Sequence, residues 1–108
     1  MEKFYKTVKL LKEKCPLAFP CTVRRVKLKK HDGLCIKKNN SFSIKIDNSL
    51  NEKSAIDTLL HEWAHARAWN HLHDSLSQKE FELIAHDASW GVAYSQVYRI
   101  FEENFYKN

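Results

Sequence analysis

Two histidines and a glutamate stand at a spacing that would let them act together on one metal ion. They lie in the string His61-Glu62-Trp63-Ala64-His65, which has the pattern HExxH. On a helix, residues four apart share one face, so both imidazoles would point at the same zinc ion while Glu62 flanks it. Zinc beside a carboxylate suits amide hydrolysis, because the metal polarises the carbonyl and the carboxylate accepts a proton from water.

A helix around this motif is predicted from the spacing of its apolar residues alone. The stripe consists of Ile56, Leu59, Leu60 and Trp63. These positions follow the helical repeat and leave the two histidines beside the stripe, where they can face a cleft. We expect the helix to begin after a cap at Ser49 or Asn51 and to run to about Asn70.

A hydrolytic zinc site normally takes three protein ligands, so one further ligand is needed after the motif. The candidates are His71, His73, Glu82 and His86. His71 gives the metzincin-type spacing, but Ala68 stands where those proteins turn the chain with a glycine. Glu82 would be a carboxylate ligand, and His73 has no spacing argument. His86 precedes the last predicted helix, where a short loop can aim it across the cleft.

Composition predicts one compact α+β domain over residues 1–108. The chain is 44% hydrophobic and has only two Gly and two Pro, so it has neither a linker nor a low-complexity tract. We find no secretory signal and no membrane-spanning run, and we therefore expect a cytoplasmic monomer. The first helix is predicted at about residues 2–14, with Phe4, Val8 and Leu11 buried, before Cys15-Pro16 ends it.

Residues 21–46 predict a three-stranded antiparallel β-meander. Its inward side chains are expected to be Val26 and Leu28, Leu34 and Ile36, then Phe42, Ile44 and Ile46. Each set alternates with polar residues, as in strands buried on one face. Asp32-Gly33 and Asn39-Asn40 are the predicted turns. The strand Phe42–Ile46, next to the motif helix, could offer a free edge to an extended peptide.

The remainder of the chain predicts a short turn and a final helix. Ser77 to Glu80 fits a capping box. Asp87 or Ser89 would cap a helix that runs to about residue 105. Its apolar stripe is Trp90, Tyr94, Val97, Tyr98, Phe101 and Phe105. The three cysteines, Cys15, Cys21 and Cys35, have no metal-site spacing and are interpreted as reduced thiols with packing roles.

Positive charge is concentrated in the first half of the chain. Residues 1–45 hold 13 of the 18 Lys and Arg residues but only three of the 13 Asp and Glu residues. Arg25, Lys27 and Lys29 are expected on the outer face of the first strand, as a strip that would contact phosphates without reading sequence. A solvated lysine-rich surface explains the same charges without a partner.

Two blocks of sequence add to the predicted order of elements: Leu60-His-Glu-Trp-Ala-His-Ala66 and His86-Asp-Ala-Ser-Trp-Gly-Val-Ala-Tyr94. Together they resemble the SprT-like zinc metallopeptidases, which include Spartan-type DNA–protein crosslink proteases and small phage-encoded members. The resemblance implies a minimal zincin-like fold and hydrolysis of protein substrates, including ones bound to DNA. It also implies that His61, His65 and His86 bind Zn²⁺ and that Glu62 is the catalytic base.

Two further assignments remain open in the sequence. Tyr94, or alternatively Tyr98, could donate a hydrogen bond to the oxyanion, although the pattern favours a role for both as core aromatics with satisfied hydroxyls. The alternative to a peptidase is a non-catalytic, zinc-stabilised module that binds nucleic acid or regulates a partner. Glu62 separates the two functions, because a structural zinc site has no need of a carboxylate beside its first ligand.

Overall fold

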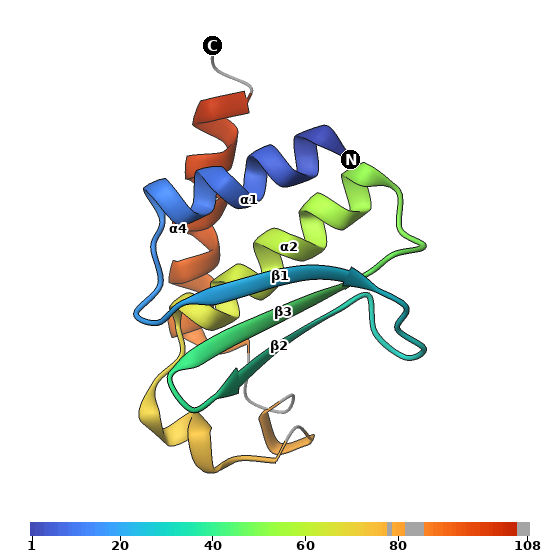
Figure 1. Cartoon of the computed structure of the whole chain (residues 1–108). Helices are drawn as coiled ribbons and strands as arrows, with labels where there is room; N and C mark the ends of the chain where they lie inside the picture. Colours follow the sequence, from blue (N-terminus) through green and yellow to red (C-terminus); the bar gives the residue numbers. More distant parts are fainter. Residues whose placement is uncertain (78, 82–85, 106–108) are drawn as a thin grey trace.

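The computed structural model describes residues 1–77, 79–81 and 86–105, with His71 and Leu72 described by their backbone only. It confirms an α+β chain in which the helices lie on one side of a three-stranded sheet (Figure 1). The elements are α1 (Glu2–Lys14), β1 (Cys21–Val26), β2 (Gly33–Lys38), β3 (Ser41–Asp47), α2 (Glu52–Arg67), the 3₁₀ helix η1 (His71–Ser75) and α4 (Ala88–Phe105). Helix α2 is central, since it contacts β2, β3, α1 and α4.

The sheet is mixed, so the predicted antiparallel meander is wrong. Its strand order is β1-β3-β2, with β3 antiparallel to β2 and parallel to β1. The turn at Asn39 joins β2 to β3 as predicted, with a positive φ of 55° that asparagine tolerates. Residues 27–32, in contrast, carry the chain past β3 to the far edge of the sheet. Alternation of apolar residues does not say which strands are neighbours.

The inward faces of β1 and β2 are one residue out of phase with the prediction. Cys35 is buried in the core and Val23 packs against the core. Val26, Leu34 and Ile36 are only partly buried. Each of these segments has apolar residues at both odd and even positions, so alternation alone leaves two registers open. The third strand has apolar residues at one parity only, and Phe42, Ile44 and Ile46 are all buried as predicted.

The predicted placement of Arg25, Lys27 and Lys29 as one strip on the outer face of the first strand is also wrong. Arg25 is two residues after Val23, so it lies on the same, inward face of β1. Its Nη2 atom donates hydrogen bonds to the carbonyl oxygens of Asp47 at 3.0 Å and Leu50 at 2.9 Å. The strand ends before Lys27, so Lys27 and Lys29 lie exposed in the loop that follows. Arg25 therefore ties β1 to the chain entering α2, and the free positive charge lies further along.

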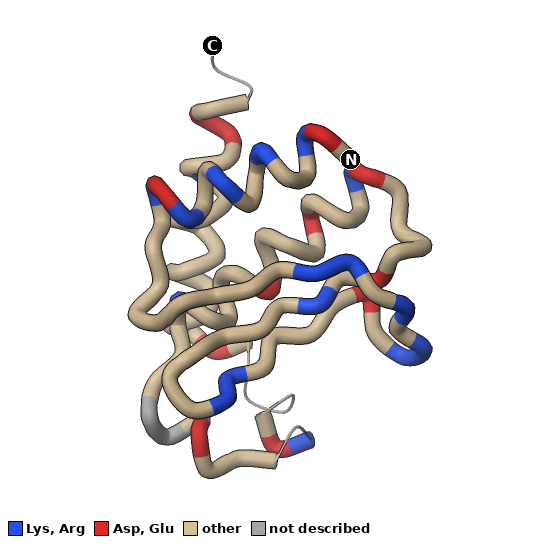
Figure 2. Tube along the Cα trace, viewed as in Figure 1, with Lys and Arg blue, Asp and Glu red and all other residues tan. Residues whose placement is uncertain are grey.

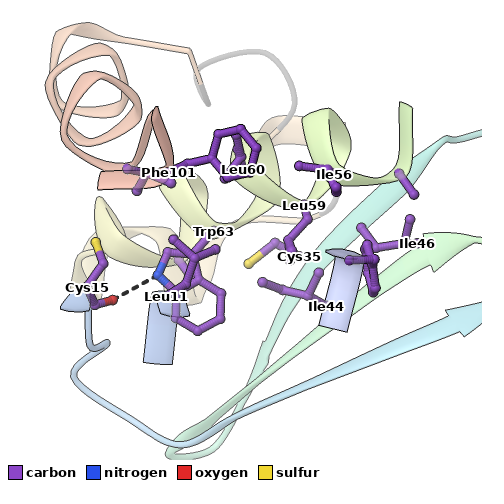
Figure 3. Close-up of a cluster of buried hydrophobic side chains, with 14 of the residues drawn as sticks. Leu11, Cys15, Cys35, Ile44, Ile46, Ile56, Leu59, Leu60, Trp63 and Phe101 are labelled. Carbon is purple, nitrogen blue, oxygen red and sulfur yellow. Dashed lines mark hydrogen bonds between the residues drawn. The ribbon is translucent and has the colours of Figure 1, made fainter. Parts of the chain in front are cut away.

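Helix α1 has the predicted bounds and is joined to α2 through a buried tryptophan. Phe4 and Leu11 are fully buried, and the helix ends at Cys15 before proline. The indole Nε1 of Trp63 donates a hydrogen bond to the carbonyl oxygen of Cys15 at 2.9 Å (Figure 3). Buried polar groups need such partners, so this bond fixes the end of α1 against the helix that carries the histidines.

The cysteines are all free, in agreement with their predicted packing role. Cys15 and Cys35 are buried, and Cys21 is partly exposed. Burial raises the pKa of each thiol, and that of Cys21 reaches about 11. The thiolate is the form that binds metals and attacks electrophiles, so these side chains act as small apolar groups at neutral pH.

Caps define the ends of the helices around the site. Asn51 caps α2 by accepting a hydrogen bond from the Ser54 amide at 2.8 Å, and Asp87 caps α4 through the Trp90 amide at 3.0 Å. Helix α2 ends at Arg67, three residues before the predicted end, and η1 follows. The predicted capping box is present: the Glu80 amide donates to Ser77 Oγ, and the Ser77 amide donates to Glu80 Oε1. Within the described residues, no helix has both the length and the apolar character needed to cross a membrane.

Candidate metal centre and active site

Three histidines from two elements converge at one point of the structure. The Nε2 atom of His61 lies 3.1 Å from that of His65 and 3.0 Å from that of His86. One ring nitrogen from each of the three histidines lies within 4.8 Å of the other two. Two imidazoles bound to a tetrahedral zinc at roughly 2.0–2.1 Å have their nitrogens about 3.3 Å apart. The three side chains can therefore hold a metal ion with small adjustments.

Each histidine is placed by a feature of the sequence described above. His61 and His65 lie one turn apart on α2, whose apolar stripe is buried against the sheet and the other helices. His86 directly precedes Asp87, the cap of α4, so the start of that helix holds it across from α2. His65 is buried and His86 is exposed, so the cluster opens towards solvent on the α4 side.

Of the other three candidate ligands, one lies away from the cluster and two lie outside the part of the chain that the structure describes. His73 accepts a hydrogen bond at Nδ1 from the Asn70 amide at 3.2 Å, and its ring contacts Trp69 and Phe81. It is not a member of the histidine cluster found among the described residues. The side chain of His71 and the whole of Glu82 lie outside the described part of the chain.

Burial keeps the imidazoles of His61 and His65 neutral. It lowers the pKa of His61 and, aided by the neighbouring histidines, lowers that of His65 to about 3. A metal ion binds the neutral imidazole, so a site of this kind loses no protons from His65 when metal enters at neutral pH. A donor set of three imidazole nitrogens suits zinc.

Trp90 contacts all three imidazoles, a role that sequence reasoning missed. Its ring centroid lies 5.0 Å from that of His61, 5.5 Å from that of His65 and 4.7 Å from that of His86. The apolar stripe of the last helix predicted that Trp90 is a core residue. The sequence signal for its place beside the histidines is its i+4 spacing from His86. Phe81 packs on the other side of His65, with centroids 5.5 Å apart.

Glu62 is nine-tenths buried in the wall of a cavity beside the histidines. The side chain is 8% exposed, and burial raises its pKa to about 7. The cavity has a volume of about 580 Å³, and it is lined by Gly33, Thr58 and Glu62 among other residues. A Cβ on Gly33 would lie 2.5 Å from Thr58 Cγ2 and 3.1 Å from Glu62 Cγ. Gly33, predicted only as a turn residue, thus lets β2 approach the carboxylate.

Tyr94 lines the same cavity as Glu62 and lies near the histidines. Its ring centroid is 6.5 Å from that of His61. Burial, together with the nearby Asp57 carboxylate, raises its pKa, so the hydroxyl remains a proton donor at neutral pH. Tyr98 stacks on Tyr94 at 6.1 Å and is 40% exposed, contrary to its predicted place in the buried stripe. Of the two tyrosines, the geometry brings Tyr94 to the site.

The chain matches no family model, no curated protein and no solved structure.

Proposed function

We propose that the protein is a zinc-dependent endopeptidase of the SprT-like kind, with His61, His65 and His86 as metal ligands. The observation that supports this proposal most directly is the meeting of three imidazole nitrogens beside a buried carboxylate in an open cavity. Three ligands leave one position of a tetrahedral metal for water or substrate, as catalytic zinc sites require. The family resemblance of the two sequence blocks supports the same function.

The side chains around the cluster supply the proton transfers that peptide hydrolysis needs. A zinc ion held there would polarise a peptide carbonyl and bring the pKa of a water molecule to about 7. Glu62 accepts the proton of the attacking water and passes it to the leaving nitrogen. Tyr94, whose hydroxyl stays protonated, donates a hydrogen bond to the carbonyl oxygen as negative charge develops on it.

The free edge of β2 is where an extended substrate would lie. The third strand is central and paired on both sides, which rules out the free edge predicted for Phe42–Ile46. Within the described residues, β2 pairs only with β3, and its residues 33–35 line the cavity of the histidines. A peptide added to that edge would be held by main-chain hydrogen bonds with a carbonyl close to the cluster.

Nucleic acid is the partner that the basic surface would suit. Lys and Arg lie along α1, at the end of β1 and in the loop after it, while acidic residues are more common in the rest of the chain (Figure 2). The contact would be made to phosphates and would be independent of sequence. It would supply substrates that are themselves bound to DNA.

Replacing Glu62 by Gln tests the proposed activity against the alternative of a zinc-stabilised module. The amide keeps the shape of the side chain but cannot accept the proton, so we expect one zinc per chain and at least about a hundredfold loss of hydrolysis. The measurement is cleavage of an unfolded protein by zinc-loaded wild type and variant. Wild-type protein that binds zinc and cleaves nothing would support the non-catalytic module.

A further inference from the structure

A second cavity adjoins that of the histidines along β2, and the proposed activity makes no use of it. It has a volume of about 490 Å³. Its wall includes Cys35 and Phe81, which also line the histidine cavity, so the two spaces meet at these residues. Residues 33–35 of β2 line the first cavity, and residues 35–37 line the second. A peptide on the β2 edge that passes one cavity also passes the other.

One side of this second cavity is apolar and fixed in position. The rings of Trp69 and Phe81 are stacked with centroids 4.7 Å apart and an angle of 28° between them. Ile36 and Leu76 also line the cavity. Trp69 is held from behind by Phe42, whose ring centroid is 5.9 Å away, so the indole is anchored to the core. A flat apolar side chain entering the cavity would meet a preformed aromatic wall.

The charged residues in the wall of this cavity, Lys37 and Asp74, are already paired. Lys37 Nζ lies 3.1 Å from the Asp74 carboxylate, and Trp69 Nε1 donates to the same carboxylate at 2.8 Å. Lys37 also lies over the Phe19 ring, 5.3 Å from its centroid. These contacts compensate both charges, so neither attracts a charged substrate group strongly. The cavity is therefore better suited to an uncharged side chain than to an acidic or basic one.

From this geometry we infer that the second cavity is a specificity pocket for a large apolar, preferentially aromatic, side chain of the substrate. In a strand, residues i and i+2 point to the same face, roughly 6.6–6.8 Å apart. Of the alternate β2 residues, Gly33 lines only the first cavity, Cys35 lines both, and Lys37 lines only the second, so the cavities are offset by about two residues along the strand. The pocket therefore receives the side chain two residues from the one that faces the histidines. This inference rests on the proposed peptidase function for its biological meaning, but the binding that it predicts is independent of hydrolysis.

The test measures peptide binding separately from cleavage. Fluorescently labelled peptides carry Phe, Ala or Glu at one position and are otherwise identical. Their binding to the zinc-loaded Glu62→Gln variant is followed by fluorescence anisotropy. We expect the Phe peptide to bind at least about tenfold more tightly than the Ala or Glu peptide, as burial of a whole aromatic side chain implies. Equal affinities would overturn the inference.

A variant that fills the pocket shows whether the preference arises there. Leu76 is partly buried in the loop after η1, and Leu76→Trp would occupy the cavity without changing the stacked rings behind it. The control is Val92→Trp on the exposed outer face of α4, where the added ring meets solvent. In the Glu62→Gln background, the Phe preference should disappear with Leu76→Trp and persist with Val92→Trp. A preference that survives pocket filling would place the recognition elsewhere.

Cleavage of the same peptides by the protein with Glu62 intact separates the two proposals. A Phe preference in both binding and kcat/KM supports pocket and peptidase together. A Phe preference in binding without any cleavage supports the pocket and contradicts the peptidase. Cleavage without any preference leaves the peptidase standing and removes the pocket.

Discussion

At the scale of single residues, the site depends on one histidine that the motif does not contain. His61 and His65 are set one turn apart by the helix itself, whereas His86 comes from 21 residues beyond His65 in the chain and meets His61 at 3.0 Å. His73 is closer in sequence but is engaged with Trp69 and Phe81. A metal ion held by all three clustered residues would link α2 to the start of α4.

The first prediction concerns the third ligand. Replacing His86 by Ala should weaken zinc binding by at least about tenfold under a competing chelator, because two imidazoles remain where three were available. His73→Ala is the matched control and should leave zinc affinity unchanged. The measurement is zinc stoichiometry against chelator concentration. Zinc binding that survives His86→Ala but is lost in His71→Ala would identify His71 as the ligand.

The second prediction concerns Gly33, which packs against the Glu62 carboxylate that we propose as the base. Gly33→Ala would drive a methyl group against Thr58 Cγ2 and Glu62 Cγ, at 2.5 and 3.1 Å. Glu62 should shift from its place beside the histidines, and hydrolysis should fall by about tenfold or more while zinc still binds. Both quantities are measured on the same zinc-loaded preparation.

A compensating change makes this prediction specific to the clash. Thr58→Ser removes the Cγ2 atom that the new methyl group would meet first. Adding Thr58→Ser to Gly33→Ala should therefore restore part of the lost activity. If the double variant were as inactive as Gly33→Ala, steric displacement through Thr58 would not be the cause.

At the scale of elements, helix caps connect the stability of the fold to the geometry of the site. Both α2 and α4 begin with a side-chain cap, but the caps lie at different distances along the chain from the clustered histidines. Asn51 is ten residues before His61, whereas Asp87 adjoins His86. Loss of either cap should destabilise its helix by about 1 kcal/mol. Loss of only one of them should also disturb the ligands.

The third prediction follows from this difference. Asp87→Ala and Asn51→Ala should each lower the free energy of unfolding by about 1 kcal/mol, measured by urea denaturation of the metal-free protein. Asp87→Ala should in addition weaken zinc binding, because the start of α4 no longer fixes His86. Asn51→Ala should leave zinc affinity unchanged. Equal zinc affinities for the two variants would show that the cap does not position His86.

At the scale of the whole molecule, the sequence predicts helices better than it predicts the faces and the pairing of strands. The bounds of α1 and the cap of α2 were predictable because long stripes and capping residues are local signals. The place of β1 beside β3 was not, since strand pairing joins residues far apart in sequence. For the same reason the gathering of His86 with the motif was one of several options, and the approach of Trp90 and Gly33 had no sequence signal strong enough to predict it.

The correction to Arg25 changes where nucleic acid would bind. Its guanidinium is bonded to two carbonyl oxygens and lies 5.3 Å from the Phe4 ring centroid, so it serves the fold. The exposed cations that remain in this region are Arg24 on β1 and Lys27, Lys29 and Lys30 in the loop between β1 and β2. This loop continues into Gly33 at the wall of the histidine cavity, so a bound phosphate backbone would run close to the proposed active site.

The fourth prediction tests this placement through salt dependence. Each phosphate contact adds about 0.9 to the slope of log affinity for duplex DNA against log salt concentration. Replacing Lys27, Lys29 and Lys30 together by Gln should lower that slope by up to about 2.7. Arg25→Gln should destabilise the fold, because it breaks the bonds to Asp47 and Leu50, yet leave the slope nearly unchanged in the folded protein. If the slope changes with Arg25→Gln and not with the lysine replacements, the DNA contact lies on β1. If no DNA binding is measurable, the positive charge is a solvated surface.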